Sequence, residues 1–209
     1  MFNIFGKIER KFSDKSIYLS FPLGITAAVF LNQFISLLRL KEIFKSYSEN
    51  VQSQMFLYPL FTGIVIYGII TPLLEEAVFR WILFGRLKFY MTTAAAAIFS
   101  SIIFGVYHGN FVQFIYATLF GLILCFVCWR YDTALASVMT HAAANVTVYT
   151  TASVGGLDFL STREGEVISI MISGFISYFI IRFIYENRPK NRHEIKKLPI
   201  FPRKWDMHS

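Results

Sequence analysis

The chain has 209 residues, of which 55% are hydrophobic, 18% are aromatic and only 16% are charged. This composition is too apolar for an ordinary soluble domain and indicates a protein that folds in a bilayer. The net charge of +7 does not call for a nucleic-acid partner, because basic residues that flank membrane helices set their topology and attract anionic lipid.

Six apolar runs are predicted to cross the membrane as helices. The hydrocarbon core is roughly 30 Å thick, and a helix needs about 20 predominantly apolar residues to cross it. The runs are continuous and lack the alternation of apolar and polar residues that is typical of barrel strands. We therefore expect an all-α bundle of transmembrane helices. In chain order, the expected spans are Ile17–Leu38, Met55–Phe84, Thr92–Tyr107, Phe111–Trp129, Thr133–Val154 and Val167–Tyr185.

The distribution of Lys and Arg predicts the orientation of this bundle. An even number of spans puts both termini on one side, and most of the 20 Lys and Arg residues fall on that side. Because basic segments stay in the cytoplasm, we expect both termini to be cytoplasmic. Residues 1–186 then form the transmembrane domain, and residues 187–209 form a basic cytoplasmic tail. The other side receives Arg39, Lys41, Lys45 and Arg163.

Charged side chains within the second run are candidates for a functional site, because each costs about 2.5–3.5 kcal/mol at mid-membrane. This run contains Glu75, Glu76 and Arg80. Residues four apart share a helix face, so Glu76 and Arg80 can pair. Glu75 lies about 100° further around the helix and could project its carboxylate into a cavity. The alternative is a purely structural network of Glu and Arg that holds two helices together.

Two histidines also lie within apolar runs. His141 and Asn145 are four residues apart and can converge on one point, where they could stabilise a developing oxyanion. Alternatively, they form structural hydrogen bonds between helices. His108 ends the third run, just before Gly109. Together with Glu75 and His141, it would complete a carboxylate and two imidazoles that can activate water. Glu75 and His108 reach a similar depth only if the third helix stops short.

Three short motifs at these positions resemble the signatures of one family. The segment Glu75-Glu76-Ala77-Val78-Phe79-Arg80 matches E-E-x-x-x-R, Phe104-Gly105-Val106-Tyr107-His108 matches F-x-x-x-H, and His141-Ala142-Ala143-Ala144-Asn145 matches H-x-x-x-N. The chain therefore resembles the CPBP family of CAAX proteases and bacteriocin-processing enzymes, also called Abi proteins. The resemblance covers a motif core of residues 59–154. The order of the motifs and their placement in apolar helices make the resemblance specific.

The resemblance implies a glutamate-dependent intramembrane endopeptidase with its active site inside the bundle. It implies that Glu75 and His108 position and activate a water molecule, and that His141 and Asn145 form the oxyanion hole. The supporting residues would be Glu76, Arg80 and Phe104. This reaction needs no cofactor. The expected partners are membrane lipid and a peptide or lipidated peptide, and the short chain is more similar to relatives from bacterial plasma membranes.

Two alternatives remain beside this interpretation. Glu75, His108 and His141 would also make a zinc site with an open fourth position. Against zinc, the H-E-x-x-H motif is absent and Asn145 is a poor zinc ligand. The buried cluster could instead serve a proton-coupled transporter, or a catalytically silent scaffold that regulates a membrane protein partner. A transporter is expected to show matching halves, and the sequence shows no such symmetry.

Overall fold

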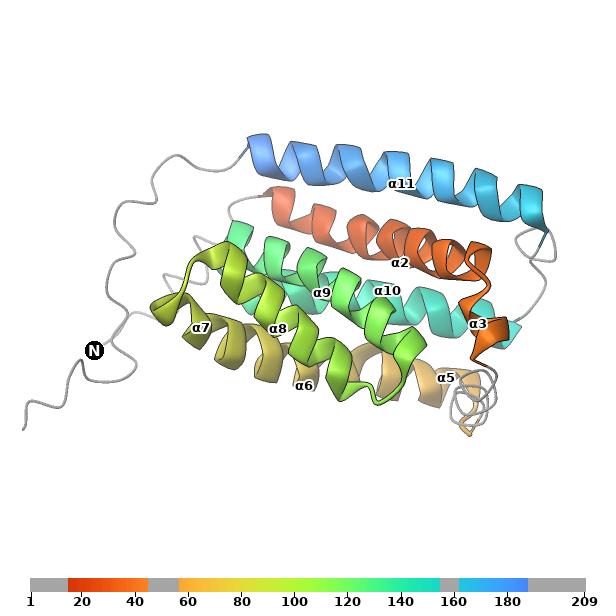
Figure 1. Cartoon of the computed structure of the whole chain (residues 1–209), viewed down its shortest axis with the longest axis horizontal. Coiled ribbons are helices and arrows are strands. Elements are labelled where there is room, and N and C mark those ends of the chain that lie inside the picture. The colour runs from red at the N-terminus through yellow and green to blue at the C-terminus, as the bar shows by residue number, and fades with distance from the viewer. Residues whose placement is uncertain (1–14, 45–56, 155–161, 188–209) are drawn as a thin grey trace, which may run out of the picture.

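The computed structural model describes residues 15–44, 57–154 and 162–187. These residues are almost entirely helical and contain no strand, which confirms the expected all-α bundle (Figure 1). The predicted start of the second span at Met55 lies outside the described residues. The same is true of the basic residues of the amino terminus before Lys15 and of the tail from residue 188 onward.

The described helices follow the predicted runs in chain order. The first span is a 3-10 turn, η1 (Lys15–Leu19), that leads into α2 (Ser20–Leu37), and the short helix α3 (Leu40–Ile43) follows it. The second is one continuous helix composed of α5 (Leu60–Gly63), η2 (Ile64–Ile70), α6 (Thr71–Glu76), η3 (Ala77–Phe84) and α7 (Gly85–Tyr90). The remaining helices are α8 (Thr93–Tyr107), α9 (Phe111–Tyr131), α10 (Ala134–Val154) and α11 (Arg163–Glu186).

Four of these helices are long and apolar enough to cross a membrane, namely those over Lys15–Leu37, Leu60–Tyr90, Phe111–Tyr131 and Arg163–Glu186. The third expected span, α8, is apolar but shorter, with 15 residues. The fifth, α10, has 21 residues but is less apolar, because it carries several hydroxyl side chains together with His141 and Asn145. The six expected helices are thus all present, and four of them are long and apolar enough to span a membrane by length and composition.

The helices run alternately in opposite directions (Figure 1). α11 is the outermost helix and packs against α2, and α2 packs in turn against α10 and α9. α10 lies on the helix of residues 60–90, and α8 packs against α9 and η3. The described chain begins at Lys15 and ends beyond Glu186 at the same end of the bundle. We call this the terminal end, and the other the opposite end.

Hydrogen bonds hold α11 to its neighbours along its whole length. Near the opposite end, Ser36 Oγ donates to Glu166 Oε1 at 2.5 Å. In the middle, Ser177 Oγ donates to Thr26 Oγ1 at 2.8 Å. At the terminal end, the buried guanidinium of Arg130 donates from Nε to the Ile184 carbonyl at 2.6 Å. α11 is therefore attached at three levels.

The turn between α8 and α9 places His108. Thr92 caps the start of α8 by accepting a hydrogen bond from the Ala95 N–H at 3.2 Å. Asn110 caps the start of α9 by accepting one from the Gln113 N–H at 2.8 Å. Between the two helices, Gly109 has a φ of 72°, which glycine adopts without a steric penalty. α8 therefore stops at Tyr107, and His108 follows it directly.

Gly24 brings α2 into direct contact with the backbone of α10. A Cβ atom at this position would lie 2.1 Å from the Thr140 carbonyl oxygen, one residue before His141. We expect Gly24→Ala to force the two helices apart and to lower the free energy of unfolding by about 1–3 kcal/mol, the usual cost of overpacking. Thermal unfolding in detergent measures this effect. Gly85→Ala is the matched control, because its new methyl group would meet no atom closer than 3.8 Å. Equal stability of the two variants would contradict the close contact.

Candidate active site

The two glutamates lie where the helix of residues 60–90 changes its winding. α6 ends at Glu76, and π-helical segments flank it on both sides, η2 before it and η3 after it. π-helical segments are rare and occur frequently at functional sites. Both glutamates face the interior of the bundle, with 9% of Glu75 and 0% of Glu76 exposed.

The pair predicted from the four-residue spacing is present. Arg80 Nη1 donates to Glu76 Oε1 at 2.9 Å, and both side chains are fully buried. Arg80 Nη2 also donates to the Gly121 carbonyl at 3.4 Å, and its guanidinium lies 4.1 Å from the centre of the Phe104 ring. Gly121 leaves room for this contact, because a Cβ there would lie 3.1 Å from Arg80 Nη2. Glu76 and Arg80 thus form a buried ion pair next to Phe104, one of the predicted supporting residues.

His141 lies between the two glutamates. Its Nδ1 is 2.8 Å from Glu76 Oε1, and its Nε2 is 3.6 Å from Glu75 Oε2. A carboxylate paired with Arg80 can only accept, so His141 Nδ1 donates this hydrogen bond. In the neutral ring, Nε2 then carries the lone pair and faces Glu75. The predicted carboxylate and imidazole are thus brought together, but His141 also contacts Glu76, which the sequence did not predict.

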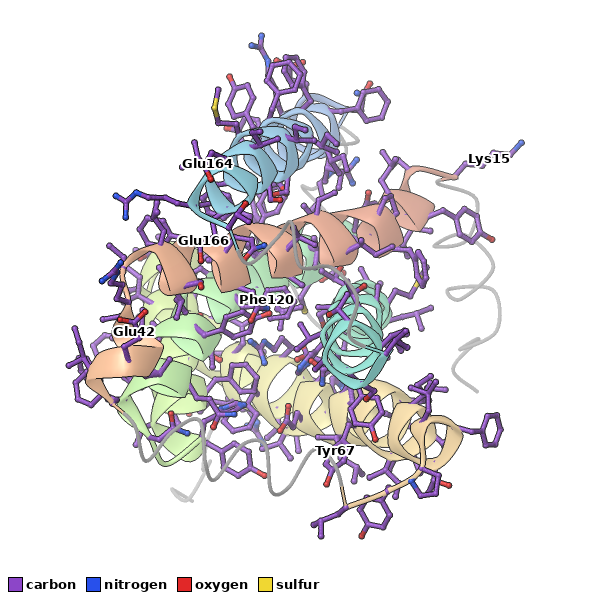
Figure 2. The ribbon with its side chains drawn as sticks, turned by 90° about the vertical axis from the view of Figure 1, so that its right-hand side faces the viewer. Lys15, Glu42, Tyr67, Phe120, Glu164 and Glu166 are labelled. Carbon is purple, nitrogen blue, oxygen red and sulfur yellow. The ribbon has the colours of Figure 1, made fainter. Side chains whose placement is uncertain are left out.

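Aromatic rings enclose His141. The rings of Phe104 and Phe120 both meet it edge to face, with centroid distances of 5.8 Å and 5.6 Å. Figure 2 shows Phe120 in the middle of the bundle. Phe120 was not among the predicted site residues, because a phenylalanine in an apolar run gives no signal of its own. The apolar surroundings strengthen electrostatic interactions between the buried polar groups.

His108 packs against the Phe104 ring. Its Nδ1 is 2.8 Å from the Phe104 carbonyl, which can only accept, so Nδ1 is protonated and Nε2 is free to accept. The His108 and Phe104 ring centroids are 4.8 Å apart. Among the described residues, His108 forms no hydrogen bond or ion pair with Glu75. Glu75 and His141 therefore lie close together, and both His108 and His141 contact the Phe104 ring.

The early end of α8 brings Glu75 and His108 to a similar depth. Counted from the turn at residues 91 and 92, Glu75 is 15 residues before Tyr90 and His108 is 15 residues after Thr93. Both residues therefore lie 15 residues along their helices from the ends at this turn. The structure thus meets the condition that the third helix must stop short.

Asn145 is attached to the helix that carries the glutamates. Its Nδ2 donates to the Tyr67 carbonyl at 2.9 Å. Tyr67 lies in the π-helical segment η2 and is visible on its helix in Figure 2. The side-chain amide nitrogen of Asn145 carries two N–H bonds. One is donated to Tyr67, and the second can donate to another acceptor. Sequence reasoning did not find Tyr67, because a contact between residues 78 positions apart leaves no local pattern.

The arrangement does not fit the three-ligand zinc site that Glu75, His108 and His141 could have formed. No three His, Cys, Asp or Glu side chains in the described part of the chain come together in a way that could hold a metal ion. The Nδ1 atoms of both histidines are engaged, by Glu76 and by the Phe104 carbonyl, so only their Nε2 atoms could bind a metal ion. A tetrahedral zinc site would need the side chains to move toward one another.

Comparisons with known proteins agree with the resemblance found in the sequence. Residues 57–147 match the family model described as "Type II CAAX prenyl endopeptidase Rce1-like". A protein of Bacillus subtilis (strain 168) named "Putative membrane peptidase YdiL" is 31% identical over 104 residues. This alignment covers 48% of the chain and 42% of the relative, so less than half of the relative is matched. No solved structure matches the chain significantly. The resemblance is therefore confirmed over residues 57–147, which contain all three motifs and match the Rce1-like family of membrane CAAX endopeptidases.

Proposed function

We propose that this chain is an integral-membrane endopeptidase that hydrolyses a peptide bond of a membrane-associated peptide. One observation carries the proposal. Arg80 engages Glu76, whereas Glu75 is outside this ion pair, is buried in an apolar bundle, and faces Nε2 of His141 at 3.6 Å. A buried carboxylate next to an imidazole is suited to take a proton from water. The match to a family of membrane endopeptidases supports the same activity.

In the proposed reaction, Glu75 accepts a proton from water, and the resulting hydroxide attacks the peptide carbonyl. His108 assists by accepting a hydrogen bond from this water through its free Nε2. The tetrahedral intermediate then collapses, the C–N bond breaks, and protonated Glu75 gives its proton to the leaving amine. The products are a carboxylic acid and an amine, so hydrolysis of the bond consumes one water molecule.

His141 and Asn145 are proposed to stabilise the oxyanion. Because Glu76 holds the proton on Nδ1 of His141, Nε2 can donate only when the ring carries a second proton. Asn145 Nδ2 donates one N–H to the Tyr67 carbonyl. Its second N–H would donate to the oxyanion. Glu76 and Arg80 act through His141, so they are positioning residues rather than catalytic ones.

The proposal places the chain in a bacterial plasma membrane with both termini in the cytoplasm. Its partners are membrane lipid and a peptide substrate, with or without a lipid modification. No step is routed through a metal ion, since the donor groups do not fit a zinc site as they are arranged.

Cleavage by the purified protein tests this function. Protein reconstituted in lipid vesicles is incubated with a library of fluorogenic peptides, and mass spectrometry locates the cleaved bonds. We expect cleavage that a metal chelator leaves unchanged, and that His108→Ala reduces by about 10²-fold or more, the smaller end of general-base contributions. Chelator-sensitive cleavage that zinc restores would refute the metal-free mechanism. Two results together would refute the enzymatic function: the purified, folded protein cleaves no peptide, and cells that carry the His108→Ala variant behave like cells that carry the wild type.

A further inference from the structure

Burial differs on the two sides of Glu75 along the bundle axis. On the side toward the terminal end, the structure is closed. A layer of side chains from η3, α8 and α9 lies on this side of Glu75. Each side chain of this layer is at most 1% exposed, namely Arg80, Phe84, Ser100, Ser101 and Cys125. Several also bond within the layer: Ser100 Oγ donates to the Phe79 carbonyl at 3.1 Å, and Ser101 Oγ lies 3.8 Å from Cys125 Sγ. The side chains of this layer are thus closed to solvent on the terminal side of Glu75.

On the side toward the opposite end, the site residues are less enclosed. His108, Asn145 and Tyr67 are each only partly buried. A Cβ atom at Gly109 would meet no atom within 4 Å, so the space beside His108 is open. The next residue with a large side chain, Phe111, is 52% exposed. A peptide that approaches from this end meets Asn145 before Glu75, because Asn145 binds the carbonyl of Tyr67, eight residues before Glu75 on the same helix.

The charges of the described residues differ between the same two ends. At the terminal end, basic residues outnumber acidic ones: Lys15, Arg86, Lys88, Arg130 and Arg182 stand against Asp132 and Glu186. At the opposite end the two signs balance, with Arg39, Lys41 and Arg163 against Glu42, Glu164 and Glu166. Figure 2 looks onto this opposite end, where Glu42, Glu164 and Glu166 are labelled. The terminal end carries five of these Lys and Arg residues and the opposite end three, which favours a cytoplasmic terminal end.

We propose that Glu75 is reached from the opposite end of the bundle, and that this end faces the outside of the cell. The substrate would then be a peptide exposed at the outer face of the membrane, such as an exported peptide or an extracytoplasmic segment, rather than a cytosolic tail. This inference rests on the proposed function, because it concerns how a peptide reaches the same catalytic carboxylate.

Thiol labelling in intact cells tests the sidedness. Two single-cysteine variants, Phe111→Cys at the opposite end and Tyr90→Cys at the terminal end, are made in a Cys125→Ala/Cys128→Ala background. Tyr90 is 82% exposed, so both new thiols can be reached. With a bulky, membrane-impermeant maleimide, we expect labelling of Phe111→Cys in intact cells, and labelling of Tyr90→Cys only after permeabilisation. Labelling should lower the cleavage rate of Phe111→Cys at least tenfold and leave that of Tyr90→Cys unchanged.

A second measurement needs no variant. Sealed vesicles of opposite orientation are prepared from the same cells and are given a fluorogenic peptide that cannot cross the membrane. Right-side-out vesicles should cleave it, whereas inverted vesicles should do so only after detergent is added. Cleavage by inverted vesicles alone, equal cleavage by both, or cleavage only in detergent would overturn the inference. Cleavage in detergent that Glu75→Gln abolishes would still support the proposed function, so the two failures can be told apart.

Discussion

Glu75→Gln is expected to lower the rate of peptide cleavage by at least about 10²-fold, within the 10²–10⁴ range of general-base catalysis. The substitution keeps the size of the side chain but removes the group that accepts a proton from water. Because the contacts of Glu76 with Arg80 and His141 do not involve Glu75, thermal stability in detergent should stay close to that of the wild type. Cleavage rates in lipid vesicles and unfolding temperatures together measure both effects.

The neighbouring glutamate provides the matched comparison. Glu76→Gln weakens the buried pair with Arg80 and changes the orientation of His141, so it should lower both stability and rate. The two substitutions thus give different signatures, one catalytic and one mainly structural. If Glu75→Gln were destabilising and Glu76→Gln only catalytically impaired, the assignment of the base would have to be reversed.

Arg80→Met is expected to cause the largest loss of stability, about 3–5 kcal/mol, because it leaves the fully buried Glu76 carboxylate without a counter-ion. Arg80 is only 1% exposed, so water cannot replace the missing charge. The stacking of its guanidinium on Phe104 is lost as well. Chemical or thermal unfolding in detergent measures the change.

The double variant Glu76→Gln/Arg80→Met separates the charge effect from the packing effect. It removes both buried charges, and the new amide oxygen can still accept the hydrogen bond from His141 Nδ1. We expect it to recover a large part of the stability that Arg80→Met alone loses. A double variant as unstable as the single one would show that packing of the guanidinium, rather than its charge, stabilises the bundle.

The sequence predicted the helices well wherever apolar runs were long, and less well at their ends. Arg86 and Lys88 mark the expected end of the second span at Phe84, yet the helix continues to Tyr90. Lys88 Nζ lies 4.9 Å from the centre of the Phe84 ring, so its positive charge is stabilised by the face of the aromatic ring one turn earlier on the helix. Likewise, α11 begins at Arg163 and not at Val167, because Thr162 caps the helix by accepting from the Gly165 N–H at 3.1 Å.

The ion pair of Glu76 and Arg80 could be predicted because both residues lie on one helix, where spacing determines the face. The contact of His141 with Glu76 could not, since it joins residues 65 positions apart and depends on how α10 packs on the helix of residues 60–90. The same holds for Asn145 and Tyr67. The π-helical winding around α6 also left no periodic signal, yet it changes which carbonyls and side chains face the interior. The catalytic roles themselves stay predictions until the variants are measured.

The attachment of α11 limits how the bundle can open sideways to lipid. A lateral gate formed by α11 swinging away from α2 would have to break the Ser36–Glu166, Ser177–Thr26 and Arg130–Ile184 hydrogen bonds together. In the middle of a bilayer, the freed hydroxyls of Ser177 and Thr26 would find no water to replace their bond. α11 therefore acts as a fixed wall, and a substrate that slides in from the lipid must pass between other helices.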